Sequence, residues 1–154
     1  MKPIHVSVHV DRPREEVFAF LDVLANHEQF CDHMLVDWTL SGPRSGVGAR
    51  ARMRANVPGP KDYADMEVKS AEPPRTIVEE AVGAKGRRRT RGTYVLEEAQ
   101  GGGTDVRFTL EYLEAPLPER ILMPLLRAWL ARANAKAMVR LGETLSPAAG
   151  PAAS

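Results

Sequence analysis

The chain has 154 residues, of which 21 are basic and 20 acidic, giving a formal net charge of +1. This length fits one domain, and 44% hydrophobic with 27% charged residues indicates a globular chain and argues against disorder. A balanced charge excludes a global field that would attract nucleic acid or an anionic membrane, so any such attraction must be local.

A single cysteine, Cys31, excludes an internal disulfide and suits a reducing compartment. The N-terminus lacks the apolar segment of a secretory signal, and no run approaches the ~20 apolar residues of a membrane span. We therefore expect a soluble, cytoplasmic protein. The glycines at positions 42, 46 and 48 lack the Gly-Lys-Ser/Thr sequence of a phosphate-binding loop, and we expect no cofactor.

The first forty residues predict a strand, a helix, a further helical turn and a second strand. Residues 4–10 alternate apolar and polar side chains, as a half-buried strand does. A helix follows from Pro13 to Leu24, and the segment His27 to Met34 has room for one more helical turn. The second strand carries three alternating apolar residues, namely Val36, Trp38 and Leu40.

Residues 49–56 and 63–69 form the most informative pattern. Arginines occupy every second position of the first segment, and acidic residues recur in the second. If the two strands form a hairpin, an arginine row lies beside an acidic row on its outer face. The inner face then carries alanines and methionines, whose small or pliable side chains leave space above them.

Three more strands are predicted over residues 75–82, 87–97 and 106–112. From Pro118 to Leu145 the apolar period becomes helical, and Pro124 either kinks this helix or begins its main part. Its apolar stripe is Leu122, Leu125, Leu126, Trp129, Ala133, Ala137, Leu141 and Leu145. We expect residues 1–145 to form a single α+β domain and residues 146–154, rich in Ala, Pro and Gly, to be a disordered tail.

Several segments carry a family resemblance. Residues 8–22 (VHVDRPREEVFAFLD) are similar to the opening strand and helix of the polyketide cyclase/dehydrase family. Residues 71–75, 92–97 and 102–106 recur at family-like spacing. The resemblance covers residues 4–145 and places the chain with START domains and the major birch pollen allergen, in the helix-grip or SRPBCC superfamily.

The resemblance implies a helix-grip fold. In this fold a curved, antiparallel, seven-stranded sheet wraps around a long C-terminal helix, with one or two short helices after the first strand. It also implies an apolar internal cavity. The recurring residues are turn-formers and core positions, so they carry over a scaffold and no catalytic group.

Glu79 and Glu80 are the first candidate site residues. Adjacent strand residues point to opposite faces, so one of the two glutamates points inward. We favour Glu79, grouped with Ile77 and Ala81, although the set Val78, Glu80 and Val82 is nearly as apolar. Burial raises the pKa of an inward carboxyl toward general acid–base use.

Arg88 is the second candidate, because Tyr94 and Leu96 set the inward parity of its strand. An inward Arg88 pairs with the glutamate or binds a carboxylate or enolate of a ligand, unless it lies beyond the cavity mouth in water. In the enzymatic interpretation Arg88 or Tyr94 stabilises an enolate while the inward glutamate moves protons. As a nucleic-acid patch, the basic run 87–91 lacks a recognition motif.

His27, Cys31 and His33 invite a metal site, but three donors on a short helix without a fourth are a weak signal, and we predict none. Seven residues are predicted to line the ligand cavity: Trp38, Met53, Met66, Tyr94, Phe108, Tyr112 and Trp129.

The sequence therefore favours a protein that binds a hydrophobic small molecule, such as a polyketide, aromatic or lipid-like compound. A cofactor-free polyketide cyclase or dehydratase is the alternative. A protein-interaction module, similar to the chaperone-activating members of the superfamily and using the outer arginine rows, is a third.

Overall fold

The computed structural model describes residues 1–59 and 61–146. The strands are β1 (Ile4–Val10), β2 (Leu35–Ser41), β3 (Arg50–Ala55), β4 (Tyr63–Glu72), β5 (Thr76–Gly83), β6 (Arg88–Glu98) and β7 (Thr104–Glu114). The helices are α1 (Arg14–Leu21), α2 (Glu28–Cys31), α3 (Leu117–Ile121) and α4 (Met123–Leu145), with short 3₁₀ turns at Leu24–Asn26 and Ala84–Gly86. Apart from Ser146, the predicted tail lies outside the described residues.

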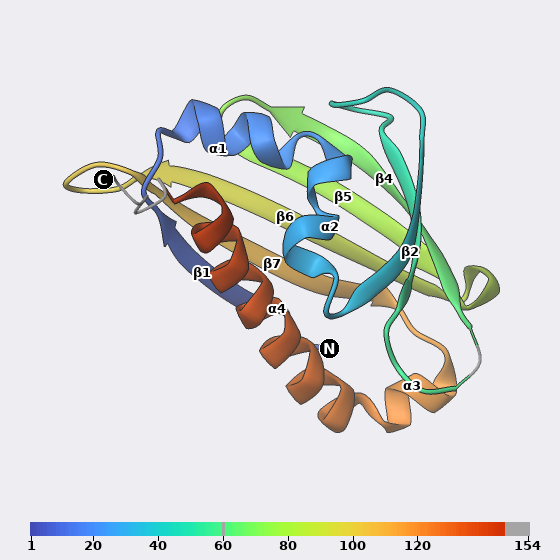
Figure 1. Ribbon diagram of the computed structural model, residues 1–154. Helices are drawn as coiled ribbons and strands as arrows, with labels where there is room; N and C mark the ends of the chain where they lie inside the picture. The colour runs from blue at the N-terminus through green and yellow to red at the C-terminus, as the bar shows by residue number, and fades with distance from the viewer. Residues whose placement is uncertain (60, 147–154) are drawn as a thin grey trace, which may run out of the picture.

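All seven strands form one antiparallel sheet in the order β1-β7-β6-β5-β4-β3-β2. The first strand pairs with the last, with Ile4 opposite Leu110 and Val10 opposite Thr104. The sheet is curved, and the helices lie on one side of it, with α4 running obliquely across the sheet (Figure 1). This is the α+β helix-grip fold that the order of elements predicts.

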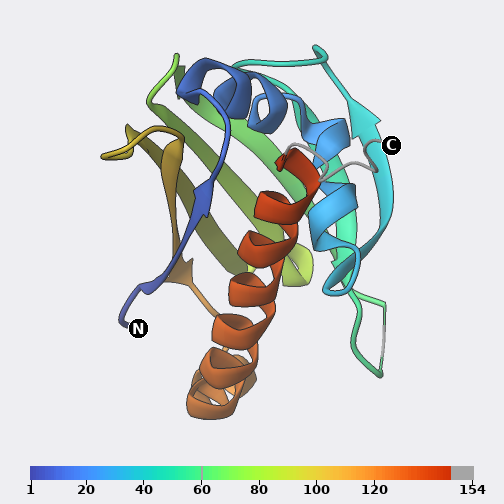
Figure 2. The same ribbon diagram turned by 60° about the vertical axis from the view of Figure 1, so that its left-hand side comes forward.

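α4 packs against β1 and α2, and its C-terminal half closes the core (Figure 2). Its buried residues are Leu130, Ala133, Asn134, Ala137, Met138, Leu141 and Gly142. The predicted stripe is therefore correct from Ala133 onward and wrong for Leu122 and Leu125, which are exposed. Figure 2 gives the reason: the first turns of α4 extend past the ends of the strands, so the sheet does not lie against them. Pro124 is the second residue of α4, so it begins this helix rather than kinking it.

The β3–β4 hairpin has the predicted alternation of charge. Arg50 lies opposite Glu67 and Arg52 opposite Asp65. Their ion-pair distances are 3.8 and 3.1 Å, on the exposed face of the sheet. The inner face carries buried alanine and methionine side chains, namely Ala51, Met53 and Met66.

β2 departs from the predicted alternation. Its pairing with β3 shifts between Val36 and Thr39, where Asp37 adopts a left-handed φ of 58°. The indole of Trp38 donates a hydrogen bond to the carbonyl of Leu35 at 3.0 Å across this bulge. Leu40 lies opposite Ala51 and so shares the inner face, although it is exposed on this edge strand. Val36, on the other side of the bulge, lies opposite Arg54 and so shares the outer face.

Candidate functional site

Glu79 points into the core from the middle of β5. It is buried, as is Ile77 two residues before it. Glu80 lies on the opposite face, where its carboxylate is 3.7 Å from Arg89 and 2.9 Å from Arg91. The preference for Glu79 as the inward glutamate is therefore confirmed, because the arginines of β6 hold Glu80 outside.

Gly92 makes room for Glu79. The two residues are register partners on β5 and β6. A Cβ atom on Gly92 would lie 3.2 Å from Cγ of Glu79 and 2.9 Å from Cε2 of Phe108. A side chain at position 92 would displace both neighbours, so this glycine serves the packing of the site.

One oxygen of the buried Glu79 carboxyl lacks a hydrogen bond. The residue is 7% exposed, and its Oε2 atom has no hydrogen-bond partner among the described residues. Burial disfavours the charged form and raises the pKa of Glu79 to about 8. At neutral pH the group is therefore mostly a neutral carboxylic acid, which donates through its O–H as well as accepting.

His27 faces Glu79 from the turn that precedes α2. Its Nε2 atom lies 2.7 Å from the carbonyl oxygen of Leu21. A carbonyl only accepts, so Nε2 carries the hydrogen and Nδ1 keeps a lone pair. Nδ1 lies 4.0 Å from Oε2 of Glu79, beyond hydrogen-bond distance. Burial lowers the pKa of His27 to about 4, so the imidazole is neutral at pH 7.

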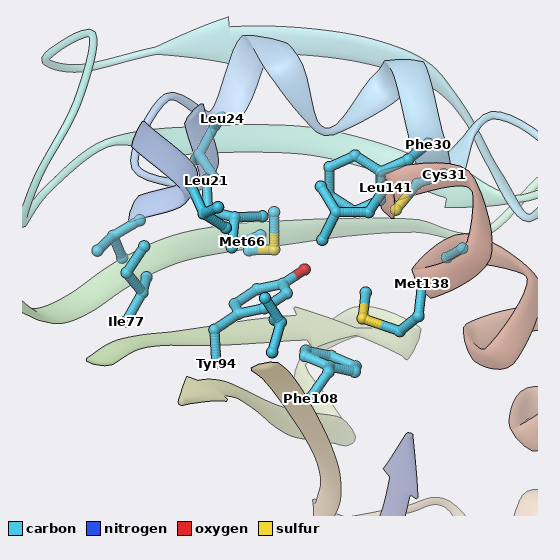
Figure 3. Close-up of a cluster of buried hydrophobic side chains, with 14 of the residues drawn as sticks. Leu21, Leu24, Phe30, Cys31, Met66, Ile77, Tyr94, Phe108, Met138 and Leu141 are labelled. Carbon is cyan, nitrogen blue, oxygen red and sulfur yellow. The ribbon is translucent and has the colours of Figure 1, made fainter. Parts of the chain in front are cut away.

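Tyr94 adds a phenol to this cluster. Its ring meets the edge of His27 with centroids 5.8 Å apart and lies against Phe108 at 4.7 Å. The hydroxyl points in among apolar side chains, including that of Met66 (Figure 3). Burial, together with the nearby Glu79, raises the pKa of Tyr94 well above its usual value. The phenol is therefore a neutral O–H group at neutral pH.

Cys31 and His33 do not complete a metal site with His27. Burial raises the pKa of the Cys31 thiol far above its usual value, so no thiolate forms. His33 turns away, with Nε2 2.8 Å from the carbonyl oxygen of Ala133. Across residues 1–59 and 61–146, no group of three His, Cys, Asp or Glu side chains is placed to hold a metal ion.

Arg88 lies on the inner face as the first residue of β6, where two carboxylates hold it. Its guanidinium binds Glu119 of α3 through two nitrogens, and Nη1 is 2.8 Å from Asp62. The predicted pairing with the inward glutamate is not formed. Arg88 instead ties α3 to the mouth of the sheet.

The seven predicted lining residues lie in different surroundings. Met53, Met66, Tyr94 and Phe108 are buried in the core, and Trp38 and Trp129 are half-buried against it. Tyr112 lines a pocket of about 500 Å³ together with Met1, Leu113, Glu114, Ala115, Arg120 and Met123. Between this pocket and Glu79, the inner face carries half-buried residues with mostly small side chains: Ala64, Ala81, Thr90 and Leu110.

The profile of the family "polyketide cyclase / dehydrase and lipid transport" matches residues 1–146. The chain belongs to this family. Solved structures agree on the fold. A Thermus thermophilus protein has a TM-score of 0.73 at 20% identity, covering 94% of this chain and 97% of that one. A Chromobacterium violaceum protein has a TM-score of 0.68 at 14% identity over 94% and 97%.

DynU16, from the dynemicin biosynthetic locus, is also similar, with a TM-score of 0.64 and 20% identity. The alignment covers 94% of this chain and 47% of DynU16. No curated protein matches the sequence of this family member. Within its described residues, no helix is long and apolar enough to cross a membrane.

In this member of the polyketide cyclase/dehydrase family, the interior polar groups are Glu79, His27 and Tyr94. Strand parity in the sequence identified Glu79 and Tyr94, whereas His27 was considered only as a donor of a metal site that we predict not to form. The spacing of His27 and Cys31 indicated a shared helical face, and both are indeed buried. Nothing local placed that face against a glutamate 52 residues further along the chain.

Proposed function

We propose that this protein binds a hydrophobic small molecule, of a polyketide, aromatic or lipid-like class, between the sheet and α4. One oxygen of the ligand lies against Glu79 and Tyr94. The observation that carries the proposal is the carboxyl of Glu79, which is buried with an unpaired Oε2. Buried polar groups are rarely left without a partner, and perturbed carboxyls of this kind concentrate at functional sites.

The chemistry of the cluster indicates what the ligand presents. At neutral pH, Glu79 and Tyr94 are both neutral O–H groups, because burial raises the pKa of each. Two such donors suit a carbonyl or phenolic oxygen, which accepts through two lone pairs. An unsatisfied buried polar group costs about 1–3 kcal/mol, and a ligand that satisfies it removes this penalty on binding. Elsewhere the walls are apolar, which suits a hydrocarbon or aromatic body.

A ligand would reach this cluster along the inner face of the sheet, from the pocket that Tyr112 lines. Tyr112 lines the pocket beside α3, and Thr90 and Ala81 continue the half-buried surface toward Glu79. The register supports this path, since Tyr112 lies opposite Thr90 and Thr90 opposite Ala81. α4 packs on β1 and α2, which leaves these middle-strand residues less covered than the core.

A cyclisation or dehydration of a polyketide-like substrate is the second candidate, favoured by the pKa of Glu79. A carboxylic acid with a pKa of about 8 can both give and take a proton near neutral pH. In its ionised form Glu79 takes the proton from the carbon next to the carbonyl, and the hydroxyl of Tyr94 donates a hydrogen bond to the enolate oxygen that forms. The carboxylic acid of Glu79 then gives that proton to the departing hydroxyl, which leaves as water while the carbon–carbon double bond forms. Arg88 has no part in this step, because Asp62 and Glu119 already bind its guanidinium.

The interaction-module hypothesis gains no support from the arginine rows, whose members are largely paired. Arg50 and Arg52 face carboxylates on β4, and Arg89 and Arg91 share Glu80. Cross-strand pairing of this kind leaves little net positive field for an acidic partner.

The test compares native with denaturing mass spectra of the purified chain and titrates it with the uncharged fluorophore N-phenyl-1-naphthylamine. We expect a small molecule that is lost on denaturation, or fluorophore binding that such a molecule displaces. Glu79→Ala and Tyr94→Phe should change this binding, whereas Glu80→Gln on the outer face should not. An empty protein that also fails to bind the fluorophore contradicts the proposal.

A further inference from the structure

An uncovered apolar surface lies where α3 meets α4. Four large apolar side chains there are between 57% and 74% exposed: Leu117, Ile121, Leu122 and Leu125. They occupy the turns that extend past the strands in Figure 2, and the exposed Leu113 at the end of β7 borders the pocket beside them. Scattered exposed leucines are ordinary, but a cluster on two successive helices indicates an interaction surface.

The solvent face of α4 continues this surface. From Leu125 to Val139 its exposed residues recur at helical spacing and are apolar or basic: Leu125, Ala128, Arg132, Ala135, Lys136 and Val139. The acidic Glu143 is exposed one turn further on, near the C-terminal end of α4. Residues 120–142 contain five basic residues and no acidic one. A solvated helix face usually mixes both signs of charge, whereas a basic and apolar face is typical of helices that lie at a membrane surface.

Three of the acidic residues near this surface are already paired. Glu119 binds Arg88, and Glu114 lies 3.7 Å from Arg89. Asp32 of α2 binds Arg140 of α4. The local field of α3 and α4 is therefore positive, although the chain as a whole is nearly neutral.

This charge decides between two occupants. In a symmetric dimer, each copy would bring its own Arg120, Arg132 and Lys136 to the interface, and these like charges would repel. An anionic bilayer offers negative headgroups to the same side chains and an acyl layer to the leucines. We propose that residues 117–125 and the solvent face of α4 form a docking surface for an anionic lipid bilayer.

Docking in this way places the pocket that Tyr112 lines beside the bilayer. Arg120 and Met123 belong both to the docking segment and to the pocket wall. A ligand exchanged with the membrane would pass through this pocket. The docking surface itself requires no ligand, so it is tested independently of the proposed function.

The experiment is flotation of the full chain with vesicles of phosphatidylcholine alone and with vesicles that also contain phosphatidylglycerol. We expect binding to the anionic vesicles, weak binding to the neutral ones, and loss of binding as salt is raised. Ile121→Ser/Leu125→Ser should lower the partition coefficient about tenfold or more. Arg132→Gln and Lys136→Gln should each lower it about fivefold.

The matched controls lie in the loop between β2 and β3. Val47→Ser removes an equally exposed apolar side chain, and Arg44→Gln an exposed basic one, and both should bind as the unsubstituted chain does. All of these positions are exposed, so folding should be retained, which circular dichroism checks. The proposal is overturned if no protein floats with the anionic vesicles. It is also overturned if Ile121→Ser/Leu125→Ser, Arg132→Gln and Lys136→Gln bind the vesicles as the unsubstituted chain does. Sedimentation of the vesicle-free chain as a dimer that Ile121→Ser/Leu125→Ser dissociates would identify a second copy as the occupant instead.

Discussion

Oε2 of Glu79 and Nδ1 of His27 face each other at 4.0 Å inside the protein, and neither group is charged at neutral pH. The hydrogen bond from His27 to Leu21 fixes the tautomer, so a lone pair faces a carboxylic acid across a gap too long for a direct hydrogen bond. An isolated pair in water at this pH would have an ionised carboxylate. Burial of both groups therefore keeps the proton of Glu79 available to a bound molecule.

The pH dependence of stability should follow from these two groups. The pKa of Glu79 rises from 4.5 to about 8, and the pKa of His27 falls from 6.5 to about 4. Between pH 4.5 and 6.5 the folded and unfolded states bind equal numbers of protons at this pair, so the pair adds no pH dependence to the free energy of unfolding. Between pH 6.5 and 8 the folded state holds one more proton, and the free energy of unfolding falls as pH rises, by ~1.4 kcal/mol per pH unit.

Glu79→Gln should change the shape of this profile. The fall in the free energy of unfolding between pH 6.5 and 8 should vanish. The effect of His27 should remain, so the free energy of unfolding should still decrease as the pH drops from 6.5 toward 4. Urea unfolding at a series of pH values measures both profiles, and Glu80→Gln is the matched control. Identical slopes for Glu79→Gln and the unsubstituted chain above pH 6.5 would refute an elevated pKa at Glu79.

Tyr94→Phe should separate binding from stability. The hydroxyl points in among apolar side chains (Figure 3), so its removal should change the free energy of unfolding by less than about 1 kcal/mol. Binding of N-phenyl-1-naphthylamine, or of a recovered ligand, should change. Tyr63→Phe, on the outer face beside Asp37, should leave binding alone. A large loss of stability in Tyr94→Phe would mean that the hydroxyl supports the fold.

Gly92→Ala should destabilise the fold by about 1–3 kcal/mol, because the new methyl group overlaps the ring of Phe108. Phe108→Leu removes that overlap. The double variant should therefore be more stable than the sum of the two single effects predicts, which a double-mutant cycle measures. Strict additivity would show that the two positions do not compete for space.

Glu119→Gln should loosen α3. Its carboxylate makes a two-pronged, half-buried contact with Arg88, and hydrogen bonds to charged groups contribute about 1.5–3 kcal/mol. Hydrogen exchange should speed up in Leu117–Ile121 with little change in the core strands. Asp65→Asn, which breaks an exposed pair with Arg52, should change stability by less than about 1 kcal/mol. Equal effects of the two substitutions would argue against a special role for Arg88 at the mouth.

Cys31 should resist thiol reagents in the folded protein. The thiol is buried and its pKa is raised, so no thiolate is available to react. Labelling with 5,5′-dithiobis(2-nitrobenzoic acid) should proceed only as fast as the chain opens, and should accelerate in urea. Rapid labelling in native buffer would show that α2 opens readily and exposes the interior.

Strand parity could be read from the sequence only where both faces were chemically distinct. Arginines alternating with alanines and methionines in β3 fixed its outer face, and Arg50 and Arg52 do lie there. In β5 the sets around Glu79 and Glu80 were nearly equal in hydrophobicity. The arginines of β6 decided between them, because Arg91 holds Glu80 on the outer side.

The apolar pattern of the long helix predicted more buried residues than the structure has, for a related reason. Leu122 and Leu125 have the spacing of buried residues, but periodicity says which residues share a face and not whether anything covers it. Coverage ends where the strands end. The uncovered leucines are the ones proposed here to meet a membrane.

The sequence by itself determined the seven strands, their order along the chain, the antiparallel sheet and the family, since hydrophobic period, turn residues and short connections are local properties. The single helix predicted from Pro118 to Leu145 is two helices in the structure, α3 and α4. Only the tertiary structure decided that Glu79 meets His27, that Arg88 is held by Asp62 and Glu119, and that the start of α4 is bare. These outcomes depend on contacts between residues about 25 to 50 positions apart and on how far α4 extends past the ends of the strands. The curvature of the sheet and the placement of α4 set such relations, and no local pattern encodes them.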